Sequence, residues 1–337
     1  MIQKATLLSV FLVAAMFSGL LVGAYELSGA KLWAALIGPT EDMSHFLIWN
    51  IRIPRVLLAA TVGGGLAISG AAIQGLFRNP LADPGIVGIS SGAMLFAVLA
   101  LVLLSTTLSN LASVFQQWTV STFAFIGALL TTLLVYKIGS QKGKVQVASM
   151  LLAGIAITAF AGAITGYLVY KSDESQLRDI TFWTLGSLSG DIWVQLSIVG
   201  PIVVIGSILI QRDARGLNAI LLGEKEAAYL GFRVEKVKQR VVVLAALVVG
   251  ACISVTGLIG FVGLVIPHLL RLLWGTDYRG LLLYSALLGG TFLVLADNLA
   301  RTIVAPAELP IGILTALIGA PFFVWLLLRS QRQIPML

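Results

Sequence analysis

The sequence predicts an all-α polytopic membrane protein with about ten transmembrane helices and with both termini in the cytoplasm. Its composition is the first reason, because 58% of the 337 residues are hydrophobic and only 11% are charged. A soluble protein is roughly half apolar and about a quarter charged. The second reason is the number of apolar runs that are long enough to cross a bilayer, which takes about 20 residues in a helix. The third is the position of the basic loops, described below.

The apolar runs lie, in chain order, at 5–24, 54–77, 85–104, 118–137, 147–170, 192–211, 240–258, 261–274, 281–299 and 311–329. The first run follows Lys4 and could be a signal peptide, but it is as long as a full span, so we expect a retained helix. The eighth lies in a stretch, 257–268, that carries three glycines and a proline, which predicts a broken or re-entrant helix. Residues 176–183 follow a polar segment and end in aromatic residues, which predicts a short outer helix that does not span. No flexible linker divides residues 1–337, so we expect a single transmembrane domain.

Basic residues concentrate in three segments, at 137–144, 212–240 and 329–332. These segments follow the fourth, sixth and tenth runs, so they share one side of the membrane. The positive-inside rule places that side in the cytoplasm together with both termini. The formal net charge of +7 therefore reflects topology. Nucleic-acid binding is not expected, because the charges do not form one stripe with aromatic residues.

The second span is built for close packing. Gly63, Ala67, Ala71 and Gly75 recur every four residues and form a stripe with almost no side chain, against which another helix can pack closely. The turn at 78–85 then places two prolines and a charge pair where the chain reverses, which fixes how the next helix re-enters.

The sequence of residues 50–93 resembles that of the permease subunits of ABC importers for iron siderophores, haem and vitamin B12. The resemblance extends over nearly the whole length of the chain. It implies a fold like that of the vitamin B12 importer permease and a location in the bacterial inner membrane, surrounded by lipid. It also implies a homodimer with the pathway between the copies, two cytoplasmic ATPase subunits that bind ATP and Mg²⁺, and a periplasmic substrate-binding protein. No cofactor is expected in this chain.

The resemblance also assigns two cytoplasmic elements. Within a polar segment at about 213–238, it implies a short helix that docks on the ATPase through Gly223, Glu224, Glu226, Ala227, Ala228, Leu230 and Gly231. The alternative is an ordinary solvated amphipathic helix. At the start of the fifth span, the resemblance implies a cytoplasmic gate formed by Val147, Ala148 and Ser149.

Three arginines are expected on the outer face, where the topology rule disfavours positive charge. Arg52 and Arg55 precede the second span and Arg301 follows the ninth. We therefore expect negatively charged groups to compensate these three positive charges. The resemblance implies that Arg52 and Arg301 receive glutamates from the two lobes of the binding protein, with Arg55 beside them, a contact that suits the guanidinium fork. The alternative is contact with lipid phosphates.

Enzymatic and metal sites are not expected. Residues 139–145 lack the glycine spacing and the hydroxyl residue of a phosphate loop, so ATP hydrolysis needs a separate subunit. Ser90 lies in a G-x-S-x-G pattern that opens a membrane helix instead of joining a strand to a helix. His45 and His268 are the only histidines, and neither has the spacing of a metal site. The single cysteine, Cys252, excludes an internal disulfide.

The substrate class and the class of transporter leave alternatives open. Residues 177–190 resemble the haem branch of the family most, while ferric siderophores and cobalamin remain possible substrates. An ion-coupled secondary transporter would need ionisable groups within its spans, which are nearly empty of them, and Asp297 lies close to the end of one. An intramembrane enzyme would need a nucleophile with a base, and no convincing pair is found.

Overall fold

The computed structural model describes residues 2–23, 25, 27–38, 43–106, 113–141 and 144–331. Over these residues, a helix occupies each of the ten predicted spans: α1 (Ile2–Leu21), α4 (Ile53–Leu76), α5 (Ile89–Thr106), α6 (Ser113–Ile138), α7 (Val147–Lys171), α9 (Ile192–Arg212), α12 (Val234–Thr256), α13 (Val262–Trp274), α14 (Tyr278–Ala300) and α15 (Ile311–Gln331). Seven helices in the described part are long and apolar enough to cross a membrane, and α5, α13 and α15 contribute shorter apolar stretches. The all-α polytopic fold is confirmed.

Shorter elements cover the two ends of the bundle. They are α2 (Gly29–Ile37), α3 (Ser44–Phe46), a π-helical turn at Leu47–Arg52, a 3₁₀ turn at Pro84–Val87, α8 (Glu174–Leu185), α10 (Ala214–Leu222) and α11 (Glu224–Tyr229). Strands β1 (Ser140–Gln141) and β2 (Lys144–Val145) form an antiparallel hairpin in which Ser140 lies opposite Val145. The short outer helix is confirmed as α8, which begins with a capping box made by Asp173 and Gln176.

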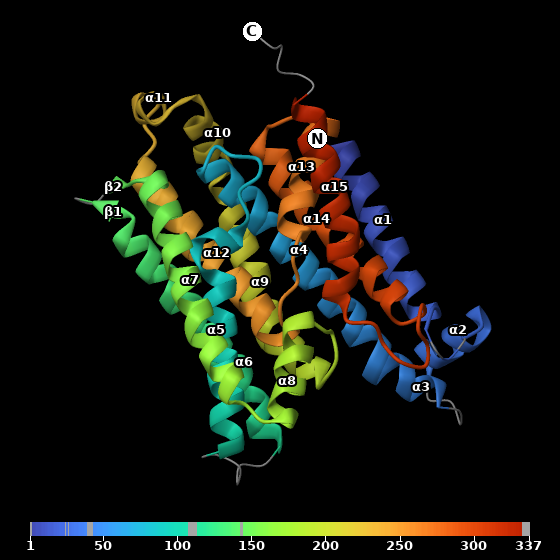
Figure 1. The fold of residues 1–337 in the computed structure, drawn as a ribbon. Coiled ribbons are helices and arrows are strands. Elements are labelled where there is room, and N and C mark those ends of the chain that lie inside the picture. The colour runs from blue at the N-terminus through green and yellow to red at the C-terminus, as the bar shows by residue number, and fades with distance from the viewer. Residues whose placement is uncertain are drawn as a thin grey trace.

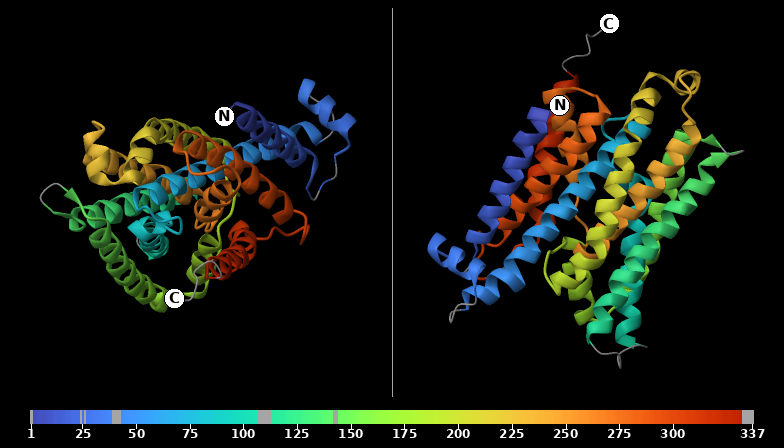
Figure 2. Two further views of the ribbon diagram at one scale, coloured as in Figure 1. Left: turned by 90° about the horizontal axis from the view of Figure 1, so that it is seen from above. Right: turned by 180° about the vertical axis from the view of Figure 1, so that it is seen from behind.

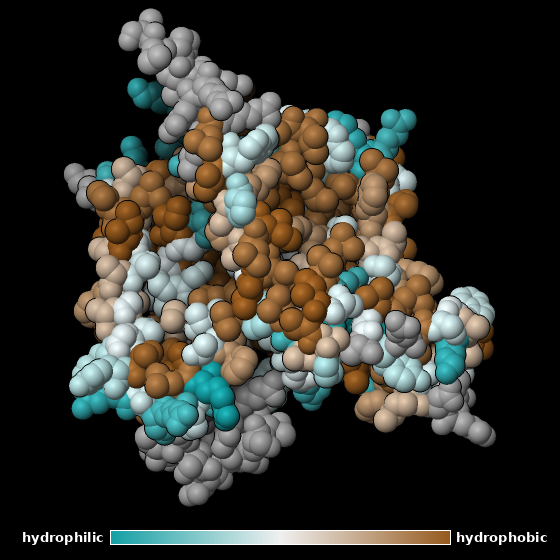
Figure 3. All heavy atoms as spheres, turned by 45° about the vertical axis from the view of Figure 1, so that its right-hand side comes forward, coloured by the Kyte–Doolittle hydropathy of each residue, from teal (hydrophilic) through white to brown (hydrophobic). Residues whose placement is uncertain are grey.

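The two ends of the bundle differ in what they carry (Figure 1). The start of α1, the end of α15, α10, α11 and the hairpin lie at one end, and α2, α3 and α8 lie at the other. This arrangement agrees with the predicted topology, in which both termini and the basic loops face the cytoplasm. In Figure 3, apolar side chains cover much of the middle of the molecule and hydrophilic ones gather toward its two ends, as a membrane-spanning surface requires.

Helix α4 runs through the centre of the bundle and is buried along almost its whole length (Figure 2). A Cβ atom added at Gly63 would overlap the carbonyl oxygen of Gly289 in α14. At Gly75, an added Cβ would lie 2.7 Å from the ring of Tyr278, which begins α14. Ala67 and Ala71, between them, are fully buried. The stripe of small residues therefore faces α14, at a separation that larger side chains would not permit.

A second close contact positions the broken segment. An added Cβ at Gly70 of α4 would overlap the carbonyl of Gly263, so α13 begins beside the second half of α4. The 13 residues of α13 cover about 20 Å, which is less than the hydrocarbon thickness of about 30 Å. Phe261 enters this helix with φ +68° and Gly257 leaves α12 with φ +69°. The predicted break in the eighth span thus lies at 257–261.

Neighbouring outer loops donate hydrogen bonds to each other's backbone carbonyls near this break. The Ser187 amide donates to the carbonyl of Thr256 at 2.7 Å, and the Ile311 amide donates to the carbonyl of Gly186 at 3.1 Å. Non-helical backbone is tolerated at membrane depth only where protein or a cavity surrounds it. The connections α8–α9, α12–α13 and α14–α15 therefore meet at the break and stabilise one another.

Replacing Gly63 with Ala should destabilise the protein, because the new methyl group meets the backbone of Gly289. Overpacking of this kind typically costs about 1–3 kcal/mol. Gly162→Ala in α7 is the matched control, since an added Cβ there meets nothing within 4 Å. The control should keep stability or raise it by up to about 1 kcal/mol through helix propensity. Thermal unfolding in detergent measures both. A Gly63→Ala protein as stable as the wild type would contradict the assigned packing.

Candidate functional site

The outer end of the bundle holds a buried ion network around Asp297. Arg55 of α4 approaches the Asp297 carboxylate of α14 at 2.9 Å, and Arg301 Nε lies 3.1 Å from the other carboxylate oxygen. Arg55 also pairs with Glu308 at 2.7 Å. The Asp297 side chain is only 2% exposed, whereas that of Glu308 is 46% exposed. One acidic residue thus holds two guanidinium groups and joins α4 to the end of α14.

Arg52 and Arg301 also hold the end of the first helix. Arg52 donates to the carbonyls of Leu20 and Leu21 at 2.6 and 2.8 Å, and it further contacts the carbonyl of Tyr25. Arg301 donates to the carbonyl of Gly19 at 3.2 Å. The last carbonyls of a helix lack partners within the helix and carry partial negative charge, so a guanidinium group suits them. Both arginines therefore cap α1.

These contacts correct our interpretation of how the arginine charges are compensated. We expected a partner protein or lipid phosphates to do this, but Asp297, Glu308 and backbone carbonyls do so within the chain. Arg52, Arg55 and Arg301 are only 2%, 6% and 7% exposed. This role of Asp297 was not predicted from the sequence, although a carboxylate in an otherwise uncharged span was a signal for it. Docking of a binding protein by these arginines remains a prediction.

The cytoplasmic end carries α11, a six-residue helix bracketed by two glycines with positive φ, Gly223 at +137° and Gly231 at +87°. Tyr229 is 88% exposed and Leu230 is 61% exposed. Leu222, just before this helix, is 70% exposed. Apolar side chains that face solvent at the tip of a loop are suited to protein contact.

The predicted coupling residues lie together on this loop, but they face different ways. Glu226, Ala228, Leu230 and Gly231 are exposed, whereas Ala227 is fully buried and cannot contact a partner. Glu224 reaches toward α12 and pairs with Lys238 at 2.7 Å. Leu222 and Tyr229 were not predicted to be coupling residues, although large apolar residues in a polar loop were a signal for them.

The three predicted gate residues form the first turn of α7, directly after β2. Ala148 is exposed, and Val147 and Ser149 are partly buried. The Ser149 hydroxyl donates to the Gln146 side chain at 3.1 Å. Farther along α7, Leu152 and Phe160 are 69% and 68% exposed. Helix α7 lies at the edge of the bundle (Figure 2), so this apolar face is open to lipid or to a second protein.

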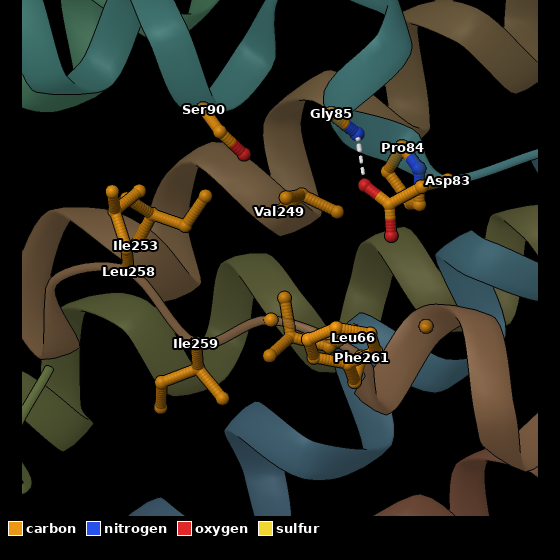
Figure 4. A pocket seen from close by; sticks show the side chains of 12 residues that line it. Leu66, Asp83, Pro84, Gly85, Ser90, Val249, Ile253, Leu258, Ile259 and Phe261 are labelled. Atoms are coloured by element: carbon orange, nitrogen blue, oxygen red, sulfur yellow. Dashed lines mark hydrogen bonds between the residues drawn. The ribbon is translucent and has the colours of Figure 1, made fainter. Parts of the chain in front are cut away.

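A cavity of about 230 Å³ lies where the broken segment meets the re-entry turn (Figure 4). Its walls come from α4, α5, α12, the 83–85 turn and residues 258–263. They are mostly apolar, and Asp83 and Ser90 supply polar side chains. The Asp83 carboxylate accepts a hydrogen bond from the Gly85 amide at 2.7 Å. Among the described residues, no group of three His, Cys, Asp or Glu side chains could hold a metal ion.

Known proteins resemble this chain both in sequence and in fold. The sequence profile of the FecCD transport family matches residues 10–329. The hemin transport system permease protein of Yersinia pestis is 46% identical, covering 93% of this chain and 91% of the relative. The cobalamin import system permease protein of Halobacterium salinarum is 43% identical, covering 89% of this chain and 80% of the relative. A solved structure described as an inward-facing metal-chelate type ABC transporter has a TM-score of 0.85 at 33% identity, covering 98% of this chain and 100% of that one.

Asp297→Asn should destabilise the protein strongly, because it leaves Arg55 and Arg301 buried without a full countercharge. Removing one partner of a buried pair typically costs about 3–5 kcal/mol. Glu308→Gln is the matched control, since it removes the other partner of Arg55 from a half-exposed position. An exposed pair is usually worth about 0–1 kcal/mol. Unfolding in detergent should separate the two variants, and equal losses would show that Asp297 is not the centre of the network.

Proposed function

The chain belongs to the FecCD transport family, and from this premise we propose that it is the permease subunit of an ABC importer that moves haem across the bacterial inner membrane. The main support is the 46% identity to a hemin permease along nearly the whole chain. Cobalamin is the second candidate, because a cobalamin permease is 43% identical. A ferric siderophore is a further alternative within the family.

The permease works as a homodimer in this proposal, with the pathway between the two copies. Apolar side chains on α7 and α15 support it, because Ile155, Leu317 and Val324 are 64%, 64% and 54% exposed. An apolar hollow of about 510 Å³ lies between α8 and α15. Exposed apolar faces beside such a hollow suit a second copy of the chain as well as lipid. In the dimer, Ala148 from each copy narrows the cytoplasmic mouth.

Two kinds of partner complete the importer. An ATPase subunit docks on each α11 through Leu222, Tyr229 and Leu230, and binds ATP and Mg²⁺ itself. A periplasmic binding protein docks on the outer ends of α4 and α14, above Arg52, Arg55 and Arg301. Because those guanidinium groups are buried, glutamates of the binding protein would reach them by exchanging with Glu308 or with backbone carbonyls.

Haem uptake should depend on ATP and not on an ion gradient. The permease, its ATPase and its binding protein are reconstituted in proteoliposomes, and haem inside the vesicles is measured by its visible spectrum. We expect uptake with ATP and none with an imposed proton or sodium gradient. Permease with Ala228→Trp is the control, because a bulky side chain on the exposed face of α11 should prevent ATPase docking. Uptake driven by a gradient alone would contradict the proposal, and transport of cobalamin in place of haem would select the second candidate.

The gate prediction is tested by cross-linking between copies. A cysteine at Ala148, in a Cys252→Ala background, should form a disulfide across the dimer in at least one nucleotide state. Cys252 is fully buried, so its removal leaves the surface unchanged. Ile205→Cys is the matched control, because it is 57% exposed but lies on α9, away from α7 (Figure 2). Failure of the Ala148 cysteine to cross-link in every state would place the gate elsewhere.

A further inference from the structure

One lysine at the cytoplasmic end of the protein is buried among oxygen acceptors. Lys238 lies in the second turn of α12, and its side chain is only 1% exposed. Its ammonium group donates to Glu224 at 2.7 Å, to the carbonyl of Val145 at 3.1 Å and to Glu235 at 3.2 Å. An ammonium group has three donors, so these contacts satisfy it completely.

The three acceptors come from three different elements. Glu224 is the first residue of α11, Val145 is the last residue of β2, and Glu235 lies one turn before Lys238 in α12. Glu235 also accepts a hydrogen bond from the Val145 amide at 2.7 Å. Lys238 and Glu235 therefore hold the Val145 backbone by both its donor and its acceptor, while Lys238 also holds α11.

The strand in this cluster leads directly into the predicted gate. Only Gln146 separates Val145 from the first residue of α7, and the Gln146 amide donates to the carbonyl of Gly139 at 2.9 Å. An added Cβ at Gly139 would overlap Met150, the fully buried fourth residue of α7. The residue between α6 and β1 is thus packed against the start of α7, and Gln146 alone joins β2 to that helix, so movement of β2 displaces the residues at 147–149.

Separation of Lys238 from its acceptors is energetically costly. A buried ammonium group without partners carries a large desolvation penalty. Lys238 must therefore follow Glu224 when α11 moves, or exchange it for another anion. Glu224 itself has a second cation nearby, since Arg78 in the turn after α4 lies 3.7 Å from its other oxygen. A displacement of α11 therefore acts both on β2 and on the turn that leads toward α5.

We propose that Lys238 is a positioning residue that transmits movement of α11 to the start of α7, through its joint contacts with Glu224 and the Val145 carbonyl. This inference rests on the proposed function, because it takes α11 to be the ATPase-docking element. Lys238 itself contacts neither ATP nor cargo. Its role is to make ATP hydrolysis on the partner productive for opening and closing the permease.

Lys238→Met should uncouple hydrolysis from transport. In the full complex in proteoliposomes, the variant should retain its ATPase subunits and hydrolyse ATP, while haem transported per ATP falls about tenfold, within the range of about 5- to 150-fold for coupled sites. Lys137→Met is the matched control, since it removes an exposed lysine at the cytoplasmic end of α6. It should leave the ratio unchanged. A wild-type ratio in Lys238→Met would overturn the proposal.

Two further measurements keep the proposal testable if Lys238→Met folds poorly. Glu224→Gln, at a half-exposed position, should lower the same ratio, and the double variant should be no worse than Lys238→Met alone, because contacting residues are not additive. If the two substitutions instead lowered the ratio of haem to ATP independently, so that their losses multiplied, the proposed role of Lys238 would be refuted. The second measurement needs no transport assay: ATPase binding should change amide hydrogen exchange at 144–150 in the wild type but not in Glu224→Gln. An equal change in both proteins would also refute the proposed role of Lys238. Absence of ATP-driven uptake by the wild type would instead refute the proposed function.

Discussion

The close packing of α4 against its neighbours is the constraint on which the rest of the structure depends. Lipid tails are as apolar as leucine, so helices in a membrane associate through tight contact and not through the exclusion of water. Gly63 meets the backbone of Gly289, and Gly70 meets the backbone of Gly263. These two contacts place α14 and α13 on α4, and with them the break at 257–261. The cavity lies at this break, where residues 258–263 face α4, α5 and α12.

Two networks of buried and paired charge lie at the two ends of this packed centre. Asp297 joins Arg55 to Arg301 at the outer end, and Lys238 joins Glu224 to the Val145 backbone at the inner end. A buried ion without its partner is very unfavourable, so each network fixes the relative position of the elements that supply it. The outer network connects the ends of α1, α4 and α14. The inner one connects α11, α12 and the hairpin before α7.

This arrangement fits a permease that is driven from one side and loaded from the other. Helix α11, the proposed ATPase-docking element, and the proposed gate belong to one cytoplasmic cluster, and no long path through the membrane is needed to link them. The outer arginines, at the proposed docking site of the binding protein, already stabilise the fold through Asp297, Glu308 and the carbonyls at the end of α1. A residue with both roles would make docking sensitive to the packing of α1 and α14, because any carboxylate from outside competes with Asp297 and Glu308.

The sequence by itself determined the ten spans, their orientation, the packing stripe on α4, the outer helix α8 and the family. The spans, the stripe and α8 follow from local periodicity and composition, and the family follows from the resemblance of its motifs, all of which lie in consecutive residues. Only the tertiary structure decided which charges meet. Arg55 and Asp297 are 242 residues apart in the chain, and Lys238 lies 93 residues from Val145. It also decided that Ala227 faces inward while Tyr229 faces out. Such contacts depend on the rotation and depth of each helix against its neighbours, and no local pattern records those two quantities.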